Sequence, residues 1–413
     1  MRTRFRVAVA IVTAVLFSTP AAARADVVLQ WNAIAVSVPA GNPFNQARVM
    51  AATQLAVFEA VNAIQGGYEP YLGTVVAPPG ASADAAVIAA AYRVLKHYVP
   101  GAAIDTLRAD SLAAIPDGDA KTAGITVGEA AAAAIIAART NDVSAVPEFY
   151  LPTSTDPGQW QLTPSCSAAG GTSVHWLDLR PFGVADAAAF VAGPPPALTS
   201  NEYTKDFDEV KRVGSKNSTE RSQDRSDVAR FYAASSPAYV MNLAARQVAE
   251  AQGRSMIHSA RALALINMAI SDAAVASFTT KYIYNFWRPE TAIRAADLDG
   301  NSKTEEDTTW EPYVLTPCFP SYGSNHGSLS GGGAEILRRV YGAGGHAIVM
   351  TNPAFPTLTY NYSEFHQITA DIADARVFGG IHYRFDQVVA ERLGREVATA
   401  VYKGNLRKLD APQ

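Results

Sequence analysis

The chain has 413 residues, 48% of them hydrophobic, and a formal net charge of −4 at neutral pH. A chain of this length can bury a large core and, as a prior, holds two domains of roughly 150–200 residues. The slightly acidic balance lacks the basic footprint of nucleic-acid-binding proteins, so we expect no nucleic-acid partner.

The N-terminus has the anatomy of a secretory signal peptide. Arginines at positions 2, 4 and 6 precede an apolar run that ends near Phe17, and Ala-Arg-Ala follows at 23–25. The run is too short to cross a bilayer, and a small-x-small triplet is typical of a cleavage site. We therefore expect a signal segment over 1–25, cleavage near Ala25, and a secreted or periplasmic protein. No later stretch approaches about 18 unbroken apolar residues, so we expect no membrane span.

Helical periodicity with many alanines dominates the rest of the chain, and alternating strand patterns are scarce. Asn42 and Pro43 predict a helix cap and first turn, and Gly66-Gly67 predicts the end of that helix. Further helices are predicted over 83–99, 125–140, 201–214 and 224–236, then from about Ser255 to Trp287, and finally from about Gly380 to Tyr402, ended by Gly404. The sequence therefore predicts an all-α fold made of a pair of helical bundles.

Residues 144–200 interrupt the helical pattern with proline, glycine and polar residues. A segment of this length without periodicity is unusual inside a compact domain, and often covers a site or links subdomains. We therefore predict three parts after the signal segment: an N-terminal helical bundle over 26–143, a connecting or lid segment over 144–200, and a C-terminal bundle over 201–413.

The chain contains two cysteines, Cys166 and Cys318. An exported protein can oxidise such a pair, but two cysteines make no disulfide framework and are too few for a metal cluster. The sequence leaves their pairing open.

Three polar clusters in the C-terminal bundle carry the candidate chemistry. In the first, KYIYNFWRPETAIR, Lys281 and Arg288 are seven residues apart, so a helix returns them to nearly one face. Pro289 then ends or kinks that helix. Two cations on one face repel each other unless an anion lies between them. The alternative interpretation is a solvated stripe on the surface.

The second cluster, CFPSYGSNHGSLSGGG, is a loop rich in small residues just before a helical pattern, and it contains Ser324, Asn325 and His326. Backbone N–H groups at a helix start bind anions, and small residues let the backbone approach a ligand closely. The alternative interpretation is a flexible loop with an incidental histidine.

The third cluster is ARVFGGIHYRFD. Arg376 and His382 are six residues apart and cannot share a straight helical face, but the glycine pair between them can break the chain and let both converge. His382 and Asp386 are four apart on the predicted following helix, so the carboxylate can orient the imidazole or raise its basicity. Alternatively, Asp386 is simply a favourable acidic residue in a first helical turn. We expect Arg384 to point elsewhere, in a solvated or structural role.

Together the clusters offer two guanidinium groups, an ammonium, a hydroxyl, loop N–H donors and two histidines. This set fits a tetrahedral or trigonal-bipyramidal oxyanion. It contains no carboxylate set for magnesium or calcium and no Cys/His set for zinc. One histidine can then attack or coordinate the central atom, while the other transfers a proton on the opposite side.

The three clusters, in this order, resemble the superfamily of vanadium-dependent haloperoxidases and type 2 phosphatidic acid phosphatases, whose pattern is K-x6-R-P, P-S-G-H and S-R-x3-G-x-H-x3-D. The first motif is complete at 281–289, the third lacks only its serine, at Ala375, and the middle one matches at Ser324 and His326. The stretches YNFWRPETAIRAAD and VLQWNAIAV are also similar to bacterial haloperoxidase-like proteins. The resemblance therefore extends over most of the chain after the signal segment, and implies their pair of helical bundles.

The resemblance implies one vanadate per chain and a haloperoxidase that oxidises halide with hydrogen peroxide. His382 would be the metal ligand, with Asp386 behind it, and His326 the catalytic acid–base. The implied oxyanion-binding residues are Lys281, which would also polarise the oxidant as a catalytic residue, Arg288, Ser324, Asn325 through its N–H, and Arg376. Further implied partners are a small organic acceptor and a second copy of the chain in a homodimer.

Two alternatives stay open. A metal-free acid phosphatase would use the same residues through a phosphohistidine at His382. A non-catalytic oxyanion-binding protein would account for the departures in the middle motif, where Gly323 replaces proline and Asn325 replaces glycine. Asparagine tolerates the left-handed backbone better than most residues, so we expect the N–H contact at 325 to survive.

Overall fold

The computed structural model describes residues 26–143 and 148–409. The predicted signal segment 1–25 lies outside these residues. Within them the chain is mostly helical, and the one sheet is an antiparallel pair of strands, β1 (Gly344–Thr351) and β2 (Thr359–Glu364). The predicted all-α fold is confirmed.

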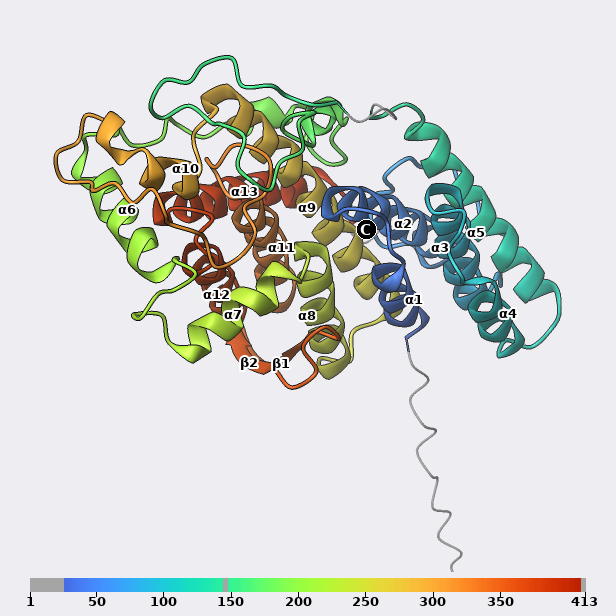
Figure 1. Ribbon diagram of the computed structural model, residues 1–413. Helices are drawn as coiled ribbons and strands as arrows, with labels where there is room; N and C mark the ends of the chain where they lie inside the picture. The colour runs from blue at the N-terminus through green and yellow to red at the C-terminus, as the bar shows by residue number, and fades with distance from the viewer. Residues whose placement is uncertain (1–25, 144–147, 410–413) are drawn as a thin grey trace, which may run out of the picture.

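The N-terminal helices lie together on one flank of the molecule (Figure 1). They are α1 (Val27–Ser37), α2 (Pro43–Gln65), α3 (Ala83–Tyr98), α4 (Asp105–Ala113) and α5 (Asp119–Ala138). As predicted, the Asn42 side chain caps α2 by accepting hydrogen bonds from N–H groups of the first turn, and Gly66, with φ of 70°, ends it. Helices α3 and α5 approach closely at Gly124, where a Cβ would lie 2.2 Å from the carbonyl oxygen of Ser82.

The long helix α9 connects the two halves of the molecule. The C-terminal helices are α6 (Asn201–Val213), α7 (Gln223–Ala233), α8 (Pro237–Ala251), α9 (Met256–Tyr284), α10 (Pro289–Arg294), α11 (Asn325–Tyr341), α12 (Phe365–Phe378) and α13 (Arg384–Gly404). Helix α9 packs against α2 on one side and against α11 and α13 on the other, so one hydrophobic core runs through both halves. The predicted division into two bundles and a connecting segment stays a prediction.

Two described helices, α5 and α9, are long and apolar enough to cross a membrane by length and composition. The apolar window of α9, with a mean hydropathy of 1.5, is 94% buried inside the protein. Burial by other helices accounts for the apolar character of α9, because a helix that is hydrophobic on all sides belongs in a core as well as in a membrane.

Several helix boundaries differ from those predicted; α5, for example, begins at Asp119 and not at 125. Two of the differences place polar residues at helix ends. Helix α9 stops before Trp287 because Asn285 adopts a left-handed φ of 44°, and Pro289 begins the separate helix α10. The last helix begins at Arg384 because Gly380 has a φ of 79°, which breaks the chain after α12. Left-handed backbone cannot continue a right-handed helix.

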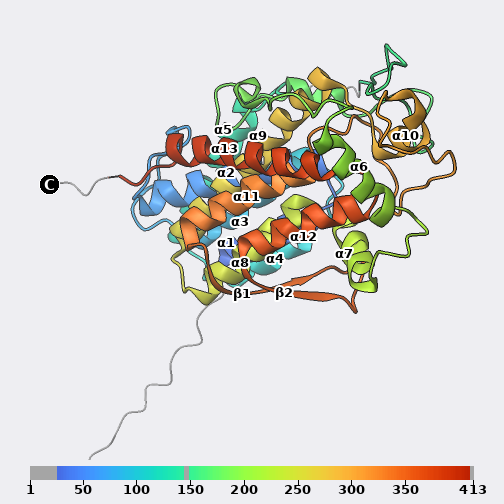
Figure 2. The ribbon, with the colours of Figure 1, turned by 90° about the vertical axis from the view of Figure 1, so that its left-hand side faces the viewer.

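Helices α11 and α13 run side by side (Figure 2). A Cβ on Gly394 of α13 would lie 2.0 Å from the carbonyl oxygen of Ser328 in α11, and one on Gly327 would lie 3.0 Å from the Cβ of Ala390. Later residues of α11 contact later residues of α13, so the two helices run in the same direction. Their N-termini therefore meet at one end of the pair.

Residues 148–200 form an irregular segment with two short 3₁₀ turns that lies against the C-terminal end of α9 (Figure 1). The N–H of Trp160 donates to the carbonyl oxygen of Asn285 at 2.7 Å, and the N–H of Thr172 donates to that of Cys318 at 2.8 Å. Cys166 and Cys318 form a disulfide, with their Cα atoms 5.2 Å apart. The structure therefore pairs the two cysteines, and the bridge fastens the segment to the loop before α11.

Removing this bridge is expected to destabilise the fold. The bridged residues are 152 positions apart, so the disulfide restricts a large part of the unfolded chain. The double variant Cys166→Ser/Cys318→Ser should lose about 2–4 kcal/mol of unfolding free energy. Urea unfolding of the variant and of the oxidised wild-type protein measures the difference, and reduced wild-type protein is the control. Equal midpoints for all three samples would contradict the expectation.

Candidate active site

The three polar clusters meet where helices end. Lys281 lies in the last turn of α9, and Arg288 caps the N-terminus of α10. Ser324 caps α11, Arg376 lies in the last turn of α12, and His382 lies in the turn before α13. Because helix ends leave backbone groups without intrahelical partners, this junction is rich in polar groups that can bind a ligand.

Lys281 and Arg288 are fully buried, so the interpretation as a solvated surface stripe was wrong. The Lys281 ammonium donates to the carbonyl oxygens of Pro320 and Ser321, both at 2.9 Å. The Arg288 guanidinium donates through Nε to the carbonyl oxygen of Phe319 at 2.8 Å. Both cations are therefore held by backbone carbonyls of the loop before α11.

His382 is fixed by a carboxylate. Its Nδ1 lies 2.8 Å from Oδ2 of Asp386, and its Nε2 lies 3.0 Å from Nη1 of Arg288. A proton on Nδ1 satisfies the carboxylate and leaves the lone pair of Nε2 on the side of the cations. We predicted that His382 and Asp386 lie on one helix, which was wrong, because His382 precedes α13. The predicted contact between the two side chains is present. Arg384 pairs with Glu209 and Asp374, in the structural role predicted for it.

The N-terminus of α11 supplies further donors. The Ser324 hydroxyl accepts a hydrogen bond from the N–H of Gly327 at 3.2 Å, which leaves its own proton free to donate to a ligand. Asn325 is the first residue of α11 and does not have the left-handed backbone that we expected. Its side-chain oxygen instead accepts a 2.7 Å hydrogen bond from the Ser277 hydroxyl of α9. The N–H at 325 therefore belongs to an ordinary helix start, which is an anion-binding position.

Three buried donors at this junction have no hydrogen-bond partner among the described residues. They are Nη2 of Arg288, Nε of Arg376 and Nδ2 of Asn325. The three buried cations Lys281, Arg288 and Arg376 stand against the single carboxylate of Asp386. Uncompensated buried charge is costly, and the cationic side chains outnumber the carboxylate, so the junction favours an anionic ligand. A tetrahedral dianion fits the donors and the charge, and vanadate and phosphate both have that chemistry.

The junction opens into a cavity of about 310 Å³. His326, which is half-buried, and His382 both line it, as does Arg376. The rest of the lining is mostly apolar and consists of Pro43, Phe44, Ala233, Pro237, Val314, Leu315, Pro317, Phe319, Leu329 and Ile381, together with Asn325. The cavity thus combines two histidines and one buried cation with a mostly apolar lining.

Burial lowers the pKa values of the cations and histidines at this junction. Burial, and then the nearby charge of Arg288, holds the pKa of Lys281 well below its usual value. Burial lowers the pKa of Arg288 to about 9 and that of Arg376 to about 10. Burial also lowers the pKa values of His326 and His382, so both imidazoles are neutral at pH 7. Neutral imidazoles offer the lone pairs that a ligand or a base needs.

Binding of a dianion is expected to take up protons at alkaline pH. In the anion-free protein the pKa of Lys281 is lowered, so the amine loses its proton at a lower pH than usual. A bound anion raises that pKa again, and the amine then takes up a proton. At about pH 8.5 phosphate is already a dianion, and the complex should take up a fraction of a proton per site. Calorimetry of phosphate binding in buffers with different ionisation enthalpies measures this number. The Lys281→Gln variant should show less uptake, and net proton release by the wild-type protein would contradict the assignment.

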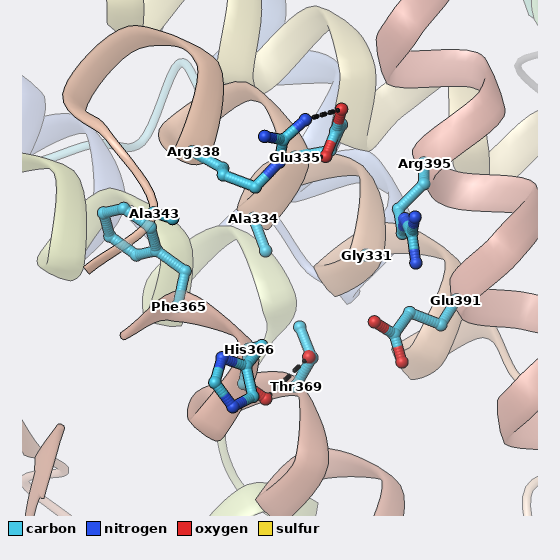
Figure 3. Close-up of a pocket in the computed structure, with 10 residues that line it drawn as sticks. All are labelled: Gly331, Ala334, Glu335, Arg338, Ala343, Phe365, His366, Thr369, Glu391 and Arg395. Carbon is cyan, nitrogen blue, oxygen red and sulfur yellow. Dashed lines mark hydrogen bonds and ion pairs between the residues drawn. The ribbon is translucent and has the colours of Figure 1, made fainter. Parts of the chain in front are cut away.

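A second hollow lies between α11, α12 and α13 (Figure 3). Glu335 there is bound by Arg338 and Arg339, whereas Glu391 and Arg395 face each other on α13. None of the predicted site residues lines this hollow. In the part of the chain that the structure describes, no cluster of three or more His, Cys, Asp or Glu side chains could hold a metal ion. Asn325, His326, Arg376 and His382 instead line the first cavity.

Sequence reasoning missed Ser321. Its hydroxyl donates to Oδ2 of Asp386 at 2.6 Å, and its carbonyl oxygen accepts from Lys281. The only signal in the sequence was its place in the small-residue loop that also contains Ser324. A fold was needed to show which loop serine faces the carboxylate.

Comparisons with known proteins bear on the same part of the chain. Residues 261–410, which hold all the predicted site residues, match the family described as the VCPO second helical-bundle domain. This match supports the superfamily of vanadium haloperoxidases. The vanadium chloroperoxidase of Curvularia inaequalis is 27% identical over 184 residues, which cover 37% of this chain and 30% of that protein.

Two solved structures share the fold of this chain over nearly its whole length. A bacterial vanadium-dependent iodoperoxidase superposes with a TM-score of 0.77 at 24% identity, covering 95% of this chain and 99% of the other. An apo-type bacterial vanadium-dependent chloroperoxidase superposes with a TM-score of 0.72 at 16% identity, covering 90% and 96%. At these identities the likeness extends to the fold, and the reaction has to be argued from the site.

Proposed function

We propose that this protein is a vanadate-dependent haloperoxidase that oxidises halide with hydrogen peroxide. The observation that carries the proposal is the buried excess of cationic side chains, with unpartnered donors, around His382, whose Nε2 lies 3.0 Å from Nη1 of Arg288. Bound vanadate supplies a Lewis-acid centre that activates peroxide. The match of residues 261–410 to the VCPO second helical-bundle domain supports vanadate over other tetrahedral oxyanions.

Each side chain of the site has a separate role in this proposal. His382 offers Nε2 to the central atom, and Asp386 holds the proton on Nδ1. Arg288, Arg376, Ser324 and the N–H of Asn325 would hold the oxygens of the bound oxyanion. Lys281 would add a positive charge that polarises the oxidant. His326 lines the same cavity and is unprotonated at pH 7, so it would be available to accept a proton from peroxide. The apolar lining that contains Phe44 limits water and suits a small organic acceptor.

A metal-free acid phosphatase is the second candidate, favoured by the His382–Asp386 pair. In this reaction Nε2 of His382 attacks phosphorus, a nitrogen–phosphorus bond forms, and the ester phosphorus–oxygen bond breaks. The leaving alkoxide takes a proton, which His326 supplies after protonation, and water then releases phosphate from the histidine. The same cations stabilise both reactions because phosphate and vanadate share shape and charge.

We propose, as part of the haloperoxidase proposal, that the protein is exported. The disulfide between Cys166 and Cys318 suits an oxidising compartment, where a signal segment over 1–25 would deliver the chain. A homodimer remains a prediction.

One experiment separates the candidates. Purified protein without its first 25 residues is assayed for halide-dependent oxidation of a phenolic reporter by peroxide, with and without orthovanadate and without phosphate. Hydrolysis of p-nitrophenyl phosphate is assayed in parallel. Vanadate-dependent halogenation is the expected result. Phosphate release alone would select the phosphatase, and vanadate binding without either activity would select the non-catalytic binding protein and make Asn325→Gly the first variant to prepare.

A further inference from the structure

Ser321 lies in the loop before α11 and is completely buried, although it has a polar side chain. Its N–H, its carbonyl oxygen and its hydroxyl each make a hydrogen bond. Its N–H donates to the carbonyl oxygen of Phe286 at 2.8 Å, its carbonyl oxygen accepts from the Lys281 ammonium at 2.9 Å, and its hydroxyl donates to Asp386 at 2.6 Å. One residue thus connects the end of α9 to the start of α13.

The hydroxyl makes the shortest contact of the Asp386 carboxylate. Oδ2 of Asp386 also contacts Nδ1 of His382 at 2.8 Å and the N–H of Tyr383 at 3.3 Å. The other oxygen, Oδ1, is buried and has no partner among the described residues. The carboxylate is therefore held through one oxygen, and the Ser321 hydroxyl decides where that oxygen lies.

We propose that Ser321 is a positioning residue that sets the affinity of the site for its oxyanion by fixing Asp386 and, through it, the His382 imidazole. The proposal rests on the oxyanion site of the proposed function, but not on which reaction follows binding. Partners behind a liganding histidine fix its tautomer and ring orientation, and their loss typically weakens binding. Through its carbonyl, the same residue keeps the Lys281 ammonium beside the site.

The first test is the Ser321→Ala variant, which removes the hydroxyl and keeps the backbone groups that bind Lys281 and Phe286. We expect its affinity for orthovanadate and for inorganic phosphate, measured by calorimetry, to fall about 10-fold. The control variant is Ser271→Ala, which removes another fully buried serine hydroxyl, one without a partner, from α9. It should bind both anions like the wild-type protein.

A double-mutant cycle separates positioning from general loosening of the fold. If Ser321 acts through the carboxylate, then Ser321→Ala should cost less than about 2-fold in an Asp386→Asn background. Thermal unfolding of all variants identifies any that fail to fold. A loss of equal size in both backgrounds, or no loss in the native background, would overturn the proposal.

A measurement on the unmodified protein keeps the proposal testable if the variant does not fold. Nitrogen NMR of histidine-labelled protein without an anion should show His382, assigned by the signal that His382→Ala removes, as the tautomer with its proton on Nδ1. The opposite tautomer would overturn the proposal. Wild-type protein that binds neither anion would overturn the oxyanion site and this inference together, whereas binding without halogenation would overturn the proposed reaction only.

Discussion

Replacement of His382 by alanine is expected to abolish vanadium binding. Nδ1 of His382 is engaged by Asp386, so the lone pair that can coordinate a central atom is the one on Nε2. The cations and N–H groups bind only the outer oxygens, so the variant should keep weak anion binding and lose at least about 100-fold in vanadate affinity. Vanadium content after incubation with orthovanadate and desalting measures the loss.

The matched control is His366→Ala. His366 is an exposed histidine of α12, paired with Glu364 and outside the first cavity. This variant should retain the wild-type vanadium content. Unchanged vanadium content in His382→Ala would contradict the ligand assignment, because the other buried groups would then suffice.

Replacement of His326 by alanine is expected to remove turnover while it preserves most of the oxyanion affinity. The imidazole lines the cavity and is neutral at pH 7, because burial and then the charge of Arg376 lower its pKa. Loss of a general acid–base typically costs about 10²–10⁴-fold in rate. The cations Lys281, Arg288 and Arg376 remain in the variant, so vanadate affinity should change by only a few-fold. Steady-state halogenation and vanadate calorimetry on the same sample separate the two effects.

Glutamine at position 326 provides a second test, since its amide can hydrogen-bond to an oxygen but cannot accept a proton. His326→Gln should be as slow as His326→Ala, with the affinity of the wild-type protein. Wild-type turnover in either variant would show that another group transfers the proton. Loss of affinity equal to the loss of rate would instead make His326 an oxyanion-binding residue.

Helices such as α2, α3 and α6, and the three clusters, were accessible from the sequence because they depend on local periodicity and fixed spacing, whereas α1, α4, α8 and α12 were not predicted. The Asn42 cap and the glycine break before His382 are local signals of this kind. The burial of Lys281 and Arg288 was not accessible, because their acceptors are backbone carbonyls of a loop about 30–40 residues away. Ser321 was missed for the same reason, since serine has no chemical signature until a carboxylate faces it. The role of the segment before α6 could not be predicted either, because only the fold shows that Cys166 lies next to Cys318.

The bridge from Cys166 to Cys318 has a consequence for a chain that is cut by a protease. The turn between α8 and α9 is exposed at Arg254, a position that trypsin-like enzymes favour. A cut there leaves every proposed site residue on the C-terminal piece and half of the shared core on the other. The disulfide spans the cut and joins the two pieces covalently. A nicked molecule therefore stays one covalently joined particle until a thiol reduces the bridge, after which the two polypeptides are held only by the packing of their shared core.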